Sequence, residues 1–250
     1  MVEINSFYAE YPLLNDNKRT KINFVDSFHR TEVIFKEIFE KEDYRDGLEY
    51  LKGVENPVCL DIGGHLGFAS LYFNNAKNAT IYTLEPNPDV FKAMKLNLAP
   101  YPNIHPVNVG IRAWNGSGEM RSDSSRSLPD SFYGIGDLSV KADFLTLRDF
   151  MKSCKIDHVD LMKLDVEGTE YETFLTKGFS SVEDRIDFIV GESHYTPKFG
   201  PNVIPGMLEN YDVKFLDTKN CYYKIDVEID GKLVTKNISL STLFTARRKK

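Results

Sequence analysis

Short apolar runs alternate with amphipathic stretches from about residue 56 to residue 194. Each run has the length of a buried strand, and each amphipathic stretch has the spacing of a helix with one apolar side. The strand-like runs are 58–62, 80–84, 104–111, 159–164 and 186–190. The helical stretches are 68–74, 90–98, 145–154 and 170–175. This alternation predicts an α/β fold with a mostly parallel sheet and helices on both faces.

The two ends of the chain have other patterns. Residues 31–44 place apolar side chains on one side of a predicted helix among Glu and Lys. Because residues 1–53 are too few for a core of their own, we predict a helical lead-in that packs on one domain formed by residues 54–250. The tail is β-rich at 211–216, 222–227 and 240–245, which predicts an antiparallel finish to the sheet.

Composition narrows the class of protein. The 250 residues are 42% hydrophobic and 27% charged, which is typical of a globular domain. A net charge of −6 disfavours nucleic acid as a partner. No apolar run approaches the roughly 20 residues that a membrane span needs. Three widely spaced cysteines and a start without a signal pattern predict a reducing, cytoplasmic location.

One irregular stretch interrupts the alternation. Residues 121–141 contain a Ser-rich segment, which indicates either an exposed loop or a flap over a site. The basic end, residues 247–250, is interpreted as a solvated terminus.

A glycine-rich turn follows the first strand. Asp61 is followed by Gly63, Gly64, His65 and Gly67. Glycines let the backbone turn sharply and approach a ligand closely. Position 62 is Ile where a dinucleotide-binding turn requires Gly, so an amine-bearing or cationic ligand suits the turn better than a diphosphate.

An acid ends the second strand. Glu85 stands where doubly wound folds place the carboxylate that binds ribose hydroxyls. Pro86, Asn87 and Pro88 follow, and Asn87 is predicted to cap the next helix.

Further acids follow the fourth and fifth strands. Asp165 and Glu167 come directly after residues 159–164, and Glu192 and His194 follow residues 186–190. The carboxyl ends of parallel strands meet at the ligand-binding edge of such a sheet. We therefore expect Asp165 or Glu167 to take part in chemistry, with the other carboxylate capping a helix, and His194 to lie near them.

Five segments together resemble the FkbM family of S-adenosylmethionine-dependent methyltransferases. They are VCLDIGGHLG (58–67), LEPNP (84–88), LTL (145–147), DLMKLDVEGTE (160–170) and ESH (192–194). Gly64 and His65 stand where the family more often has Ala and Asn. The resemblance implies a Rossmann-like class I methyltransferase fold with a seven-stranded sheet. It also implies O-methylation of a hydroxyl on a sugar, a glycan or a natural product.

The same resemblance implies which residues bind S-adenosylmethionine. Asp61, Gly63 and Gly67 would line the methionine and adenosine parts, Glu85 would bind the ribose, and Asn108 would meet the adenine edge. The full predicted cofactor set is Asp61, Gly63, Gly64, His65, Gly67, Glu85, Pro86, Asn87, Asn108 and Asp165.

An acceptor hydroxyl must lose its proton as the new bond forms, so a general base is expected. The candidates are His194, Asp165 and Glu167, with His194 or Asp165 ahead of Glu167. A magnesium or manganese ion held by these groups is an alternative, with the metal-free route ahead. The acceptor is expected to contact the Ser-rich loop and residues 195–210. Two other functions stay open: a non-catalytic module that binds S-adenosylmethionine, and an NAD-dependent oxidoreductase.

Overall fold

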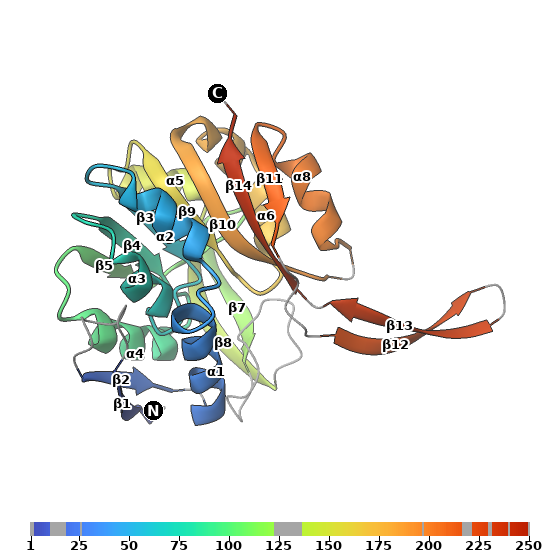
Figure 1. The fold of residues 1–250 in the computed structure, drawn as a ribbon, viewed down its shortest axis with the longest axis horizontal. Helices are drawn as coiled ribbons and strands as arrows, with labels where there is room; N and C mark the ends of the chain where they lie inside the picture. Colours follow the sequence, from blue (N-terminus) through green and yellow to red (C-terminus); the bar gives the residue numbers. More distant parts are fainter. Residues whose placement is uncertain are drawn as a thin grey trace.

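A seven-stranded sheet forms the centre of the molecule in the computed structural model (Figure 1). From one edge to the other, its strands are β11 (Tyr211–Phe215), β14 (Ser241–Arg248), β10 (Ile186–His194), β9 (Val159–Leu164), β3 (Val58–Ile62), β4 (Thr80–Leu84) and β5 (Ile104–Val107). β14 runs antiparallel to both of its neighbours, and the other pairs are parallel. The α/β prediction, its mostly parallel sheet and its antiparallel finish are confirmed.

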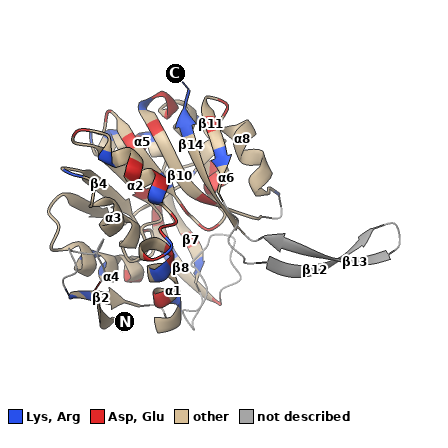
Figure 2. Cartoon of the chain, viewed as in Figure 1, with Lys and Arg blue, Asp and Glu red and all other residues tan. Residues whose placement is uncertain are grey.

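The structure describes residues 3–10, 19–25, 27–122, 137–196, 198–216, 222–229, 232–239 and 241–249. Most of the Ser-rich segment, residues 121–141, which was interpreted as either an exposed loop or a flap, lies outside these ranges. Within them, no helix is long and apolar enough to cross a membrane. Basic and acidic residues are interspersed along the described helices and strands (Figure 2).

Helices cover both faces of the sheet. One face packs against α1 (Phe28–Phe39), α2 (Arg45–Lys52), α3 (Phe68–Phe73) and α4 (Pro88–Leu98). The other packs against α5 (Leu147–Ser153), α6 (Glu170–Phe174), α7 (Lys177–Ser180) and α8 (Ile204–Met207), with 3₁₀ turns at Glu183–Arg185 and Pro201–Val203. Successive residues of β3 serve the two faces in turn: Cys59 joins the first core, and Leu60 joins the second. This explains why the strand reads as a continuous apolar run.

The strand order creates a crevice at one position. From β3 the chain moves outward to β4 and β5, and later crosses to β9 on the other side of β3. After β3 and β9 the chain therefore continues to helices on opposite faces of the sheet, α3 and α6, and open α/β sheets bind ligands at such a point.

Three smaller sheets accompany the central one. They are β1 (Asn5–Ala9) with β2 (Thr20–Phe24), β12 (Tyr222–Ile229) with β13 (Lys232–Ser239), and β6 (Gly110–Ile111) with β8 (Leu138–Leu145) and β7 (Gly116–Ser122). The predicted lead-in is thus not only helical, because β1 and β2 precede α1. The predicted helix over 31–44 instead spans Phe28–Phe39, and Glu42 beyond it has a left-handed conformation with φ 55°.

The predicted strand over 104–111 is two strands. β5 ends at Val107, where the Val109 amide donates a hydrogen bond to the Val107 carbonyl in a tight turn. β6 then pairs with β8 in the three-stranded sheet. This turn brings Gly110 and Ile111 to the edge of the crevice.

Candidate active site

A cavity of about 490 Å³ opens at the carboxyl ends of β3, β4, β9 and β10. Its volume is within the usual range of small-molecule sites. α1 and the loop after it form one wall, and Met120 and Phe144 of the three-stranded sheet contribute to another. The cavity therefore lies at the crevice that the strand order creates.

The glycine turn after β3 packs closely against the end of β4. Gly63 has φ 80°, and its amide and that of Gly64 donate to the Leu84 carbonyl. A Cβ on Gly64 would lie 2.2 Å from Thr83 Oγ1. Gly63, Gly64 and His65 line the cavity. Gly67 does not: it is the N-cap of α3, and a Cβ at this position would lie 2.9 Å from Leu98 Cδ2.

Glu85 presents a fixed carboxylate to the cavity. Its Oε2 accepts a hydrogen bond from the His65 amide at 3.0 Å, and its Oε1 accepts one from the Asn87 amide at 2.8 Å. The side chain is buried but lines the cavity together with Pro86. Each carboxylate oxygen has further acceptor capacity, so Glu85 can bind hydroxyl groups without moving.

Asn87 and Asn108 hold the Glu85 loop in place and lie outside the cavity lining. The Asn87 side chain caps α4 by accepting from the Asp89 amide at 2.9 Å, as predicted for a helix cap. The Asn108 amide group donates to the carbonyls of Glu85 at 2.7 Å and Pro86 at 3.1 Å. These bonds use the side chain that we expected at an adenine edge.

Asp61 lies beneath the cavity and not in its wall. Its fully buried carboxylate accepts from Ser70 Oγ at 2.7 Å, and its Oδ1 lies 3.4 Å from Lys163 Nζ. The ammonium of Lys163 also donates to the Gly63 carbonyl at 2.7 Å and lies 3.5 Å from Asp165 Oδ2. Burial lowers the pKa of Lys163, but Asp165 and Asp61 outweigh it and raise that pKa overall. Asp61 therefore acts on the site through a buried cation.

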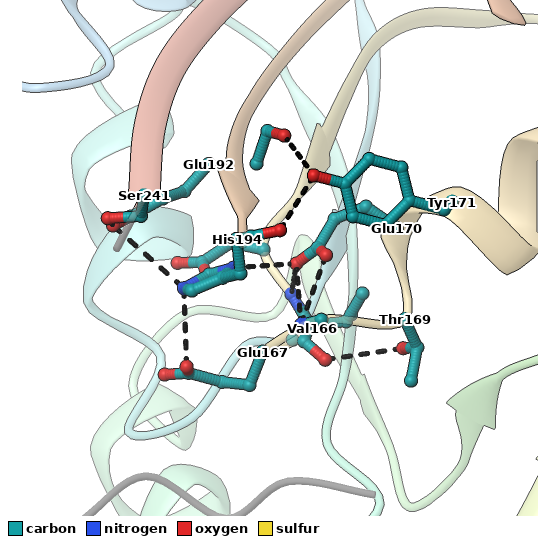
Figure 3. Close-up of polar contacts among 12 residues, drawn as sticks. Val166, Glu167, Thr169, Glu170, Tyr171, Glu192, His194 and Ser241 are labelled. Atoms are coloured by element: carbon teal, nitrogen blue, oxygen red, sulfur yellow. Dashed lines mark hydrogen bonds and ion pairs between the residues drawn. The ribbon is translucent and has the colours of Figure 1, made fainter. Parts of the chain in front are cut away.

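His194 lies between two glutamates (Figure 3). Its Nδ1 is 2.9 Å from Glu170 Oε1, and its Nε2 is 3.2 Å from Glu167 Oε2. Glu192 lies farther away, with Oε1 3.9 Å from Nε2, and accepts a hydrogen bond from Ser241. The cavity thus receives Glu167 from the loop after β9 and His194 from the end of β10.

Glu170 shapes the loop that carries Glu167. Its carboxylate accepts from the Val166 amide at 3.1 Å and from the Gly168 amide at 3.0 Å. Glu167 between them has a left-handed φ of 53°. Glu170 is fully buried, so it fixes both the loop and the imidazole of His194 without reaching the cavity.

The charges of this cluster shift two pKa values. Burial lowers the pKa of His194, but the carboxylates of Glu167, Glu170 and Glu192 outweigh it and hold that pKa well above 6.5. Partial burial of Glu167 raises its pKa to about 7, although the positive charge of His194 opposes this. At neutral pH the imidazole is therefore protonated, and Glu167 exchanges its proton in the physiological range.

Asp165, Glu170 and His194 also have the residue types of a metal site, since one ligand atom of each lies within 4.8 Å of the others. However, the Glu170 carboxylate already accepts two amides, and Nδ1 of His194 faces Glu170. In this structure Glu170 and His194 therefore bond to each other, and Glu170 also bonds to the loop that carries Glu167.

Sequence reasoning missed the wall formed by α1 and Tyr44. Arg30, Val33, Ile34, Glu37 and Ile38 of α1 line the cavity, as do Asp43 and Tyr44 after it. The helical spacing at 31–44 was the available signal, but nothing in it indicates which domain face the helix covers. The described part of residues 195–210, which was expected to contact the acceptor, is not in the lining.

The cavity suits S-adenosylmethionine. Gly63 and Gly64 allow a close approach, Glu85 offers a carboxylate for ribose hydroxyls, and the apolar Ile111 is available to a flat base. Together with the strand order, this defines a Rossmann-like class I methyltransferase.

Comparisons with known proteins agree with this assignment. Residues 61–225 match the methyltransferase FkbM domain, which is about two thirds of the chain. The protein therefore belongs to the FkbM methyltransferase family, is a methyltransferase, and uses S-adenosylmethionine as its cofactor. No curated protein matches the sequence at a significant level.

Solved structures of methyltransferases are similar to this chain at low sequence identity. The S-adenosylmethionine-dependent methyltransferase from Agrobacterium tumefaciens is 10% identical, with a TM-score of 0.50 over 98% of this chain and 71% of that one. A putative rRNA methylase from Clostridium thermocellum is 9% identical, with a TM-score of 0.49 over 83% and 96%. TrmK from M. capricolum, solved with S-adenosylhomocysteine, is 13% identical, with a TM-score of 0.42 over 81% and 68%.

Proposed function

We propose that this methyltransferase transfers the methyl group to a hydroxyl of a sugar, a glycan or a natural product, with Glu167 as the proton acceptor. The observation that carries the proposal is the Glu167–His194 pair at 3.2 Å, which lies in the same cavity as Glu85 and the glycine turn. A titratable pair at the end of a cofactor cavity is what proton removal from an acceptor requires.

The chain contributes mainly by positioning. When bound, S-adenosylmethionine supplies a methyl group made electrophilic by a positively charged sulfur. Gly63, Gly64 and Glu85 would hold the cofactor on the β3–β4 side, while Glu167 and His194 face the β9–β10 side. Fixing two reactants in line supplies a large part of the lowering of a barrier.

The two members of the pair have different roles. An imidazolium cannot accept a proton, and the acids around His194 keep it protonated at neutral pH. Glu167, with a pKa of about 7, can accept the proton from an acceptor hydroxyl. His194 then orients the Glu167 carboxylate and stabilises its charge, in contrast to the sequence-based order that placed His194 ahead.

The lining supports a hydroxylated acceptor with an apolar face. Glu37 and Asp43 add carboxylates from the N-terminal wall, and Met120 and Phe144 add apolar side chains from the three-stranded sheet. Carboxylates bind hydroxyl groups, and apolar side chains pack on the C–H face of a sugar ring.

Methyl transfer from radiolabelled S-adenosylmethionine to a panel of sugars, glycosides and polyketide-like alcohols tests the proposal. RNA and protein serve as competing acceptors, and NAD serves as a control ligand in titration calorimetry. We expect methylation of a hydroxylated compound and a loss of rate in His194→Gln with unchanged affinity for S-adenosylhomocysteine. Transfer only to RNA or protein, or NAD binding in place of S-adenosylhomocysteine, would refute it.

A further inference from the structure

A carboxylate in the cavity is tied to the N-terminal segment. Tyr44, between α1 and α2, is buried, and its hydroxyl donates a hydrogen bond to Asp165 Oδ2 at 2.9 Å. Its ring lies 5.7 Å from Lys163 Nζ, within the range of a cation–π contact. Tyr44 precedes the matched family region, which begins at residue 61. A residue outside that region thus contacts a candidate catalytic group directly.

Asp165 lies between the two halves of the cavity. Its amide donates to the Ile62 carbonyl at 3.2 Å, and its own carbonyl packs against Gly63 of the glycine turn. Glu167 follows two residues later on the side of His194. With S-adenosylmethionine held at Gly63 and Glu85, the Asp165 carboxylate would lie between the cofactor and the Glu167–His194 pair.

Two carboxylates lie close to the buried ammonium of Lys163 at this position. Asp61 and Asp165 share one ammonium, that of Lys163, at 3.4 Å and 3.5 Å. Asp61 is fully buried and outside the lining, whereas Asp165 lines the cavity. Of these two carboxylates, Asp165 is therefore the one that a ligand in the cavity can contact.

Tyr44 can hold this carboxylate without neutralising it. Burial and the nearby Asp165 raise the pKa of Tyr44 well above 10, so the phenol stays a neutral donor. A neutral donor fixes the orientation of the carboxylate and leaves its charge available to a ligand.

We propose that Tyr44 is a positioning residue that holds the Asp165 carboxylate beside the path of methyl transfer, where its charge favours the sulfonium of S-adenosylmethionine over the neutral sulfur of S-adenosylhomocysteine. Tighter binding of the donor than of the product limits product inhibition. This inference rests on the cofactor of the family and is independent of the hydroxyl acceptor.

Titration calorimetry with S-adenosylmethionine and S-adenosylhomocysteine, in the absence of an acceptor, tests the inference. The variants are Tyr44→Phe and Asp165→Asn. Tyr72→Phe is the matched control, because the buried hydroxyl of Tyr72 also donates to a carboxylate, Glu42 Oε2 at 3.2 Å, away from the cavity. Tyr44→His, which keeps a ring and a donor, serves as a second variant at position 44.

The ratio of the two affinities is the decisive readout. We expect Asp165→Asn to lower the preference for S-adenosylmethionine about tenfold, and Tyr44→Phe to lower it about threefold. Tyr44→His should retain part of the preference, and Tyr72→Phe should retain all of it. A wild-type ratio in Tyr44→Phe, or an equal change in Tyr72→Phe, would overturn the inference. Failure to methylate any hydroxylated acceptor would instead refute the proposed function and leave this ratio unaffected.

Discussion

Gly63 and the carbonyl oxygen of Asp165 are so close that a Cβ at position 63 would lie 1.8 Å from that oxygen. The contact joins the loops that follow β3 and β9, two neighbouring strands of the central sheet. It sets the distance between the glycine turn on the cofactor side and the acids on the other side of the cavity.

Gly63→Ala should therefore destabilise the protein. A side chain here meets the Asp165 carbonyl and also strains a backbone with φ 80°, so we expect a loss of about 2 kcal/mol or more in the free energy of unfolding. Urea denaturation measures the loss. Gly206→Ala in α8 is the control, because a Cβ at position 206 would meet no neighbouring atom within 4 Å. Equal free energies of unfolding for the two variants would show that the close contact between position 63 and the Asp165 carbonyl does not limit stability.

Glu85→Ala should weaken the binding of S-adenosylhomocysteine. Removal of a buried carboxylate that binds a ligand costs about 1–3 kcal/mol. Titration calorimetry gives the affinity, and Glu49→Ala, an exposed acid on α2, is the control. Unchanged affinity in Glu85→Ala would mean that the ribose is bound elsewhere.

The rate of methyl transfer should rise with pH through about 7, because Glu167 must be deprotonated to accept a proton. Glu167→Gln should remove this rise and lower the rate by about 10²–10⁴-fold. A pH profile of kcat for both proteins checks the prediction. A rise that persists in Glu167→Gln would assign the base to another group.

The same carboxyl predicts a pH dependence of stability. Its folded pKa of about 7 is above the ordinary 4.5, so its stabilising contribution is complete below pH 4.5 and is lost as the pH rises through 7. Glu167→Gln should lose less stability than the wild type between these pH values. Urea denaturation of both proteins at pH 4.5 and at pH 7 measures the loss. An equal loss in wild type and Glu167→Gln would show that folding does not raise the pKa of Glu167.

Lys163→Met should be strongly destabilising, since it leaves Asp61 buried without its cation. Loss of one partner from a buried ion pair costs about 3–5 kcal/mol. Urea denaturation of Lys163→Met beside Lys152→Met, an exposed lysine of α5, separates burial from the loss of a charge. A similar stability of both variants would show that Asp61 has another compensating partner.

Local patterns were enough for much of the fold and for part of the site. The predicted runs at 58–62, 80–84 and 159–164 coincide with β3, β4 and β9. The positions of Glu85 and the glycine turn follow from these strands, because residues just after parallel strands lie at the same edge of the sheet. The cap at Asn87 is likewise a local interaction.

Three-dimensional packing decided the rest. Asp61 reads as a ligand-binding acid, yet the neighbouring β9 places the Lys163 ammonium above it. Asn108 ends a strand, yet its amide group binds the Glu85 loop.

The sequence by itself determined the class of fold, the protein family with its cofactor, and the residues that directly follow the strands. These features depend on patterns among neighbours along the chain. Only the tertiary structure decided which charges meet. The protonated state of His194 and the attachment of Tyr44 to Asp165 arise from residues distant in sequence. Electrostatic shifts depend on distance and burial in space, which periodicity does not encode.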